Sequence, residues 1–192
     1  METWMMIAIG AAGVAAIGVV VGGLLWADRR KRGKQTSTLR EGFGPEYART
    51  VGEQGRSDAE KDLIARQERS NLFPVRSLTA IEVTHYTDRW ASAQAQFVVD
   101  PGAAMSATGH LVAEVIAARG YPGAEFEQGA SALSVDHPRV VQDYRAAHAV
   151  ELRHQRNPVA TDELRAAMGQ YHHVFTELTQ GATLSAPVVS VA

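Results

Sequence analysis

Two Glu-x-x-His pairs have the residue types and the spacing that best suit metal chemistry in this chain. Glu82 and His85 form one pair, and Glu151 and His154 form the other. A spacing of three places both side chains on one face of a helix, and di-iron bundles combine two such pairs with single glutamates from two other helices. Glu114 and Glu177 are available as those glutamates. We hold this di-metal site as an alternative only, because both pairs flank the expected apolar helix faces.

A second polar group lies in the segment Ser134–His148. It consists of Asp136, His137, Tyr144 and His148. As an acid–base site it would use His148, which is one helical turn from Tyr144. As structure, either Asp136 or His137 would cap a helix, and Tyr144 and His148 would hydrogen-bond to a neighbouring helix. We favour the structural interpretation.

Other common chemistries find no support in the sequence. The chain has no cysteine, so thiolate metal sites, iron–sulfur clusters and cysteine nucleophiles are excluded. It has no Gly-x-Ser-x-Gly nucleophile elbow, and its glycines form neither a P-loop nor a dinucleotide fingerprint. His172 and His173 are most simply a surface pair. We therefore expect no cofactor and no catalytic activity.

Residues 5–26 form a stretch without any charged, amide or imidazole side chain. At about 1.5 Å per residue such a helix is about 33 Å long, which is enough to cross a hydrocarbon core of about 30 Å. Trp4 and Trp26 bracket the stretch, and indole rings favour bilayer interfaces. A cleaved signal peptide is the competing interpretation, but the run is too long and no basic residue precedes it. The sequence predicts an uncleaved membrane span.

A basic cluster follows the predicted span. It holds five of the 19 lysine and arginine residues, and none precedes the span. The positive-inside rule then predicts a cell-membrane protein with its N-terminus outside and the rest of the chain in the cytoplasm. Together with the two tryptophans, the membrane-interface residues would be Arg29, Arg30, Lys31, Arg32 and Lys34.

The predicted span also carries a GxxxG pattern formed by Gly18 and Gly22. Two glycines one turn apart let a second helix approach closely. A homodimer through this face is one possibility, and chance spacing among several glycines is the other.

The remaining chain is expected to be all-α, because no segment alternates polar and apolar residues between hairpin turns. We expect a bundle of about four longer helices preceded by short entrance helices. Capping boxes are expected at Ser57–Glu60 and Thr79–Glu82, and Asp100 is expected to cap the next helix. The expected organisation is an external N-terminus (1–4), a transmembrane helix (5–26), a basic juxtamembrane linker (27–38), a cytoplasmic helical domain (39–180) and a disordered tail (181–192).

Apolar residues at helical spacing mark the faces that these helices should bury. The four sets are Tyr86, Trp90, Ala93 and Phe97; Leu111, Val112, Val115 and Ile116; Val141, Tyr144, His148 and Leu152; and Leu164, Met168, Tyr171, Phe175 and Leu178.

Charge argues against nucleic-acid binding by the helical domain. Residues 36–180 contain 14 basic and 19 acidic residues, so this part of the chain is net acidic. Binding to nucleic acid depends on neutralising phosphates with basic side chains. We expect no nucleic-acid partner.

Three segments carry a resemblance to known sequences. They are residues 39–47, which include Gly-Phe-Gly-Pro-Glu-Tyr, residues 120–127, and residues 134–148, which read Ser-Val-Asp-His-Pro-Arg-Val-Val-Gln-Asp-Tyr-Arg-Ala-Ala-His. With a single N-terminal span, the chain resembles a widespread group of uncharacterised bacterial membrane or "secreted" proteins. The resemblance implies no activity, because none is established for the group.

These observations favour a membrane-anchored protein that binds another protein or acts as a scaffold at the cytoplasmic membrane face. Its partners would be the lipid bilayer and a protein of unknown identity. The alternatives are the di-metal bundle and a lipid- or small-molecule-binding module with a groove lined by Tyr121, Tyr144 and Trp90.

Overall fold

The computed structural model describes residues 33–72, 74–122 and 125–180. The chain divides into two compact units, Met1–Glu41 and Gly42–Ala192. Every regular element in the described residues is an α-helix, so the all-α prediction is confirmed. Residues 33–43 are helical, so a helix begins within the segment expected as the juxtamembrane linker (27–38).

The predicted membrane span at 5–26, with Gly18, Gly22 and the bracketing tryptophans, lies outside the described residues, as does the predicted tail at 181–192. None of the helices that the structure does describe combines the length and the apolar character needed to cross a bilayer.

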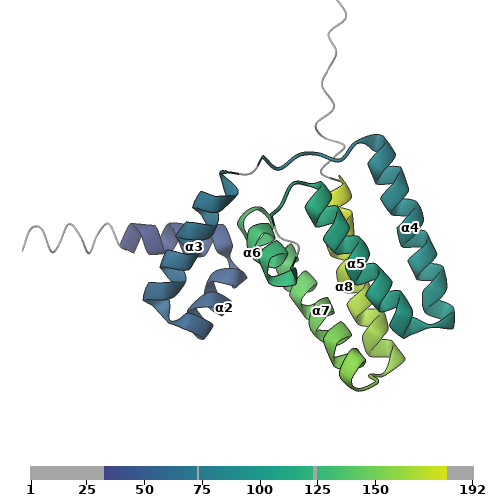
Figure 1. Ribbon diagram of the computed structural model, residues 1–192. Coiled ribbons are helices and arrows are strands. Elements are labelled where there is room, and N and C mark those ends of the chain that lie inside the picture. The colour runs from purple at the N-terminus through teal and green to yellow at the C-terminus, as the bar shows by residue number, and fades with distance from the viewer. Residues whose placement is uncertain (1–32, 73, 123–124, 181–192) are drawn as a thin grey trace, which may run out of the picture. The chain divides into compact units, whose positions relative to one another are not determined.

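Four long helices make up about half of the second unit (Figure 1). They are α4 (Ala80–Val99), α5 (Pro101–Ala118), α7 (Val140–Arg156) and α8 (Thr161–Gln180). Helix α5 contacts α4, α7 and α8, and α7 packs along α8. Because α4 leads into α5 through the single residue Asp100, the two helices must run in opposite directions side by side.

Local signals fix the starts of two of these helices. Thr79 and Glu82 form the expected capping box, in which each side chain accepts a hydrogen bond from the backbone N–H of the other residue. The Asp100 carboxylate accepts from the backbone of Ala103, as expected, and Pro101 occupies the first helical position. The other expected capping box is wrong. Helix α3 begins at Arg56 after Gly55, without a side-chain cap.

Most of the predicted apolar faces are buried in one core. Trp90 and Ala93 are buried from α4, and the predicted residues of α5 and α8 are buried as a set. The α7 face is only partly as predicted. Val141 and Tyr144 are buried as expected, whereas Leu152 is exposed and Val140, Ala147 and Glu151 are buried as well. The polar Glu151 misled the sequence interpretation, because buried carboxylates are rare.

Three shorter helices form a second group. Helices α2 (Pro45–Gln54) and α3 (Arg56–Ser70) contact each other, and α3 packs on α6 (Phe126–Asp136). Gly44 and Gly55 bound α2 with φ angles of 49° and 78°, a region that glycine adopts without strain. Ala59 and Leu63 bury the inner side of α3. This group therefore places α3 against α6.

Candidate functional site

A carboxylate surrounded by three arginines lies where α2, α3 and α7 meet. Glu46, on the first turn of α2, has no solvent exposure. Arg49 donates to both of its oxygens, at 3.0 and 2.7 Å. The Oε1 atom also accepts from Arg66 at 3.0 Å and from Arg145 at 3.4 Å. Removing one carboxylate would therefore affect the packing of three helices.

Each arginine also reaches a second acidic or hydroxyl group. Arg66 donates to Asp62 at 2.6 Å and to the hydroxyl of Ser134 at 3.4 Å. Arg145 donates to Glu127 at 2.7 Å, and Arg49 donates to Glu53. Ser134 and Glu127 lie on α6, so the network joins four helices.

The environment of Glu46 keeps its carboxylate ionised. Burial by itself would raise the pKa of Glu46, but the hydrogen bond from Arg49 and the charges of Arg145 and Arg49 outweigh it, with a further hydrogen bond from Arg66. The net result is a pKa below the ordinary value. The same contact with Glu46 raises the pKa of Arg49.

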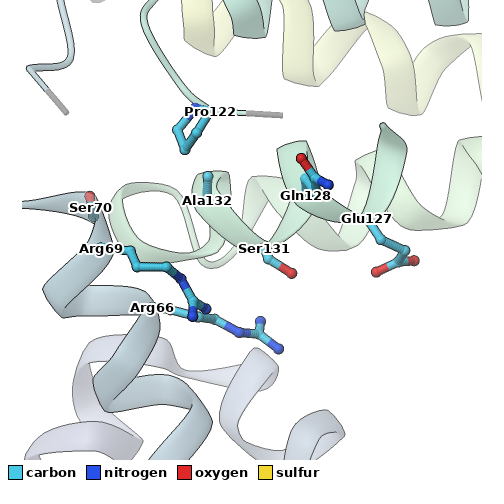
Figure 2. Close-up of a pocket in the computed structure, with 8 residues that line it drawn as sticks. All are labelled: Arg66, Arg69, Ser70, Pro122, Glu127, Gln128, Ser131 and Ala132. Carbon is cyan, nitrogen blue, oxygen red and sulfur yellow. The ribbon is translucent and has the colours of Figure 1, made fainter. Parts of the chain in front are cut away.

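A pocket of about 470 Å³ opens beside this network, between α3 and α6 (Figure 2). Figure 2 shows the side chains of Arg66 and Arg69 extending in the same direction from α3, along the side of α6 that carries Ser131. Arg66 is bound to carboxylates, whereas Arg69 has no carboxylate partner among the described residues. The pocket is lined by Arg66, Arg69, Ser70, Pro122, Glu127, Gln128, Ser131 and Ala132.

A second buried carboxylate has a different environment. Glu151 on α7 accepts from the hydroxyl of Tyr171 at 2.8 Å and from the hydroxyl of Ser106 at 3.2 Å. Gly109 on α5 makes room for this contact, since a Cβ atom there would lie 2.5 Å from Glu151 Oε2 and 3.1 Å from the Tyr171 hydroxyl. Burial, followed by the charge of Glu151, raises the pKa of Tyr144 to about 12 and also raises that of Tyr171.

The residues considered for a di-metal site do not come together. The described part of the chain holds no group of three or more histidine, aspartate or glutamate side chains placed to bind a metal. Glu82 caps α4 and pairs with Arg76, whose hydrogen bond lowers the Glu82 pKa to about 2. Glu114 pairs with Arg89, and Glu177 lies 3.6 Å from His137.

The two histidines of the Glu-x-x-His pairs have separate surroundings. His85 packs edge-on against the ring of Tyr86, with ring centres 5.5 Å apart. His154 Nδ1 accepts a hydrogen bond from the backbone of Val159 at 3.2 Å and helps to end α7. The described residues therefore do not assemble the di-metal site considered from the sequence.

The predicted polar cluster divides between two sets of partners. His137 packs edge-on against Tyr121, and the charge of Asp136 acts on the buried Tyr121 hydroxyl. Tyr144 and His148 instead pack on Phe126, with ring centres at 4.7 and 3.7 Å. Neither Asp136 nor His137 is the N-cap of α7, because α6 extends through Asp136 and α7 begins at Val140.

His172, His173 and Lys34 lie on the surface of the described structure. His172 and His173 are exposed, as expected, but each has a partner. His172 lies against Trp90 at 5.0 Å between ring centres, and His173 contacts Asp143 at 2.6 Å. Of the basic cluster, the structure describes only Lys34, which is exposed in the helix at 33–43.

The groove expected along Tyr121, Tyr144 and Trp90 is absent from the described structure. All three side chains are buried in the core. Tyr144 lines a cavity beside Glu151.

Sequence reasoning missed the arginine network. The available signal was that each of the three segments carrying the resemblance supplies one member, namely Glu46, Glu127 and Arg145. The pairing partner Arg66 lies outside those segments. No local sequence pattern indicates its role, because its contact with Glu46 spans 20 residues. No protein-family model, curated protein or solved structure matches this chain.

Proposed function

We propose that this protein is a membrane-anchored binding protein whose α3–α6 pocket takes a small anionic amphiphile. The observation that carries the proposal is the pocket of about 470 Å³ with Arg69 at its edge and no carboxylate bound to that guanidinium in the described residues. Ligand pockets commonly have volumes of about 300–1,000 Å³, with a few polar groups among apolar surface.

The lining supports an anionic group over a cationic one. Arg69 offers donors, and Ser70, Gln128 and Ser131 add hydroxyl and amide donors around it. Glu127, the acidic residue of the lining, is already bound by Arg145 at 2.7 Å. Guanidinium groups bind carboxylates and phosphates through parallel hydrogen bonds. Pro122 and Ala132 supply apolar surface for the rest of the ligand.

The arginine network supports the pocket by holding α3 against α6. Arg66 is only 7% exposed and is fixed by Glu46 and Asp62 on one side and by Ser134 on the other. Its guanidinium therefore forms a wall of the pocket at a set position. A preformed wall lowers the ordering cost that a ligand must overcome on binding.

The membrane location remains part of the proposal. The predicted span at 5–26 and the basic cluster after it support anchoring at the cytoplasmic face of the cell membrane. A bilayer is a source of anionic amphiphiles, so the two parts of the proposal are consistent.

The test uses the full chain in nanodiscs of phosphatidylcholine and the ligands octanoate, octyl phosphate and octanol. Isothermal titration should give saturable binding of the two anions and much weaker binding of octanol. Arg69→Ala should weaken anion binding about tenfold or more, a loss of about 1.4 kcal/mol. Arg56→Ala, an exposed arginine on the first turn of the same helix, should leave binding unchanged.

Equal binding of octanol, or unchanged binding by Arg69→Ala, would refute the anion pocket. Nanodiscs that contain phosphatidylglycerol distinguish the two sources of an anionic group. If phosphatidylglycerol competes with the added anion, the natural ligand is a lipid headgroup. If it does not compete, the natural ligand is a free anion.

A protein-binding role is the second candidate, and one exposed pair favours it. Val98 and Val99 are adjacent at the end of α4, and each is 86% exposed. Exposed apolar groups of this kind occur at protein interfaces. Pull-down of the intact anchored chain, compared with a Val98→Ser/Val99→Ser variant, tests this role. A partner captured equally by both proteins would exclude this pair as its binding surface.

A further inference from the structure

The cavity beside Glu151 is separate from the α3–α6 pocket and is built for the opposite charge. It has a volume of about 200 Å³, and its lining includes Glu151, Tyr171, Tyr144, Phe126 and His148. Ala113 and His110 are exposed members of the lining, so the cavity opens to the surface of α5. A volume of this size holds a molecule of only a few heavy atoms, since a water molecule takes about 30 Å³ in the liquid.

The Glu151 carboxylate in this cavity has no lysine or arginine partner among the described residues. Glu151 is 8% exposed, and its donors are the neutral hydroxyls of Tyr171 and Ser106 and the amide of Gln155 at 3.4 Å. The closest basic atom given by the structure is His148 Nδ1, at 3.7 Å from Oε2. Glu46, by contrast, is bound by three arginines.

A buried carboxylate without a lysine or arginine partner can gain from an added positive charge. Buried charges in proteins are normally paired, because leaving one unpaired costs several kcal/mol. Neutral hydroxyls supply hydrogen bonds but no positive charge. A ligand that brings a positive charge into the cavity would therefore be stabilised by Glu151.

The walls of the cavity also suit a cation. Phe126 stacks on His148 at 3.7 Å and packs on Tyr144 at 4.7 Å between ring centres. Tyr144 in turn packs against Tyr171 at 6.2 Å. Aromatic faces attract cations through their quadrupoles. Glu125 adds a second carboxylate to the lining. No lysine or arginine among the described residues lines the cavity.

From this cavity, its buried carboxylate and its aromatic walls, we infer that the protein binds a small primary ammonium compound at Glu151. The ammonium group would lie against Glu151 and donate to its oxygens, and a short apolar chain would lie along Phe126 and Tyr144. Gly109 is required for this arrangement, since a side chain there would displace Glu151.

The test titrates the full chain in phosphatidylcholine nanodiscs with n-butylammonium, 1-butanol and butyrate. Butylammonium should bind saturably with millimolar affinity, and the other two compounds should not. Glu151→Gln keeps the shape of the side chain and should weaken butylammonium binding about tenfold or more, equivalent to about 1.4 kcal/mol. Glu68→Gln, an exposed glutamate on α3, is the matched control and should bind normally.

A second variant covers the outcome in which Glu151→Gln fails to fold. Ala113→Leu adds bulk to an exposed position of the lining without touching the buried carboxylate, and it should block butylammonium. Butylammonium binding that survives both substitutions, or equal binding of 1-butanol, would overturn the inference. Arg69→Ala should not affect butylammonium, so this site and the anion pocket can fail independently.

Nanodiscs with phosphatidylethanolamine distinguish two sources of the ammonium group. Weaker apparent binding of butylammonium in these discs would assign the site to a lipid headgroup. Unchanged binding would assign it to a free amine.

Discussion

Arg66 Nη1 lies 3.0 Å from Glu46 Oε1, and both side chains are withdrawn from solvent, at 7% and 0% exposure. The pair joins α2 to α3, and the hydrogen bond from Arg66 to Ser134 continues the contact to α6. Breaking a buried ion pair by removing one partner is strongly destabilising, because the remaining charge stays buried. The position of the short helices therefore depends on one carboxylate.

Glu46→Gln should lower the free energy of unfolding by about 3–5 kcal/mol, the range for a buried pair that loses one partner. The physical reason is that Arg49, Arg66 and Arg145 lose their shared negative charge. Urea unfolding of the full chain in mild detergent, followed by circular dichroism, measures the change. Glu53→Gln, at a half-exposed site, should cost less than about 1 kcal/mol. Equal costs for the two variants would contradict the role given to Glu46.

The contribution of Glu46 should also depend on pH. Its folded-state pKa is lower than its ordinary value of 4.5, so the unfolded chain takes up a proton first as the pH falls. The stabilisation is present above the unfolded pKa and is lost as the pH falls through the folded pKa. The stability difference between wild type and Glu46→Gln should therefore be constant near neutral pH and shrink as the pH falls below about 4.5. A constant difference across this range would show that ionisation is not involved.

His137 should add a pH dependence nearer to neutrality. Burial, partly opposed by the charge of Glu177, lowers its pKa from the ordinary 6.5. The unfolded chain then binds more protons, so stability should fall as the pH drops below about 6.5 and level off below the folded pKa. His137→Phe should remove this component from thermal melts recorded across the range. His85→Phe, at an exposed position, should leave this pH-dependent component of stability unchanged.

Gly109→Ala should disturb the contact between Glu151 and Tyr171. Because the new Cβ would lie 2.5 Å from Glu151 Oε2, the carboxylate must move, and we expect a loss of about 1–3 kcal/mol. Gly169→Ala is the matched control, since a Cβ there meets nothing within 4 Å. It should stabilise helix α8 by up to about 1 kcal/mol. Thermal melts of both variants give opposite shifts if the packing is as described.

The exposed position of Leu152 on α7 can be tested by a pair of leucine substitutions. Leu164 on α8 is 2% exposed, so Leu164→Ala should cost about 2–5 kcal/mol. Leu152 on α7 is 37% exposed and should cost less than about 1 kcal/mol when it is replaced by alanine. A large loss of stability from Leu152→Ala would show that Leu152 is buried, as the sequence predicts.

Local features of the sequence were sufficient to predict several elements. The capping box at Thr79 and Glu82 and the cap at Asp100 depend on residues within one helical turn, so they can be read directly. The apolar stripe of α8 was also read correctly, because every third or fourth residue is large and apolar. The all-α class follows from such patterns.

The sequence was a poor guide where a buried residue is charged. Helix α7 buries Glu151 and exposes Leu152, which reverses the usual preference of these residue types. Only the presence of Tyr171, Ser106 and the space over Gly109 makes burial of Glu151 favourable. Those partners come from other helices, so no window along α7 contains the information.

The sequence by itself determined that the described chain is helical, where two of its helices begin, and which residues form most of the core. Tertiary structure alone decided which charges meet. Arg145 and Glu46 are 99 residues apart in the chain, yet their side chains share one hydrogen bond in the interior. The physical reason is that capping and amphipathicity act over one or two turns, whereas the pairing of buried charges depends on which helices pack together.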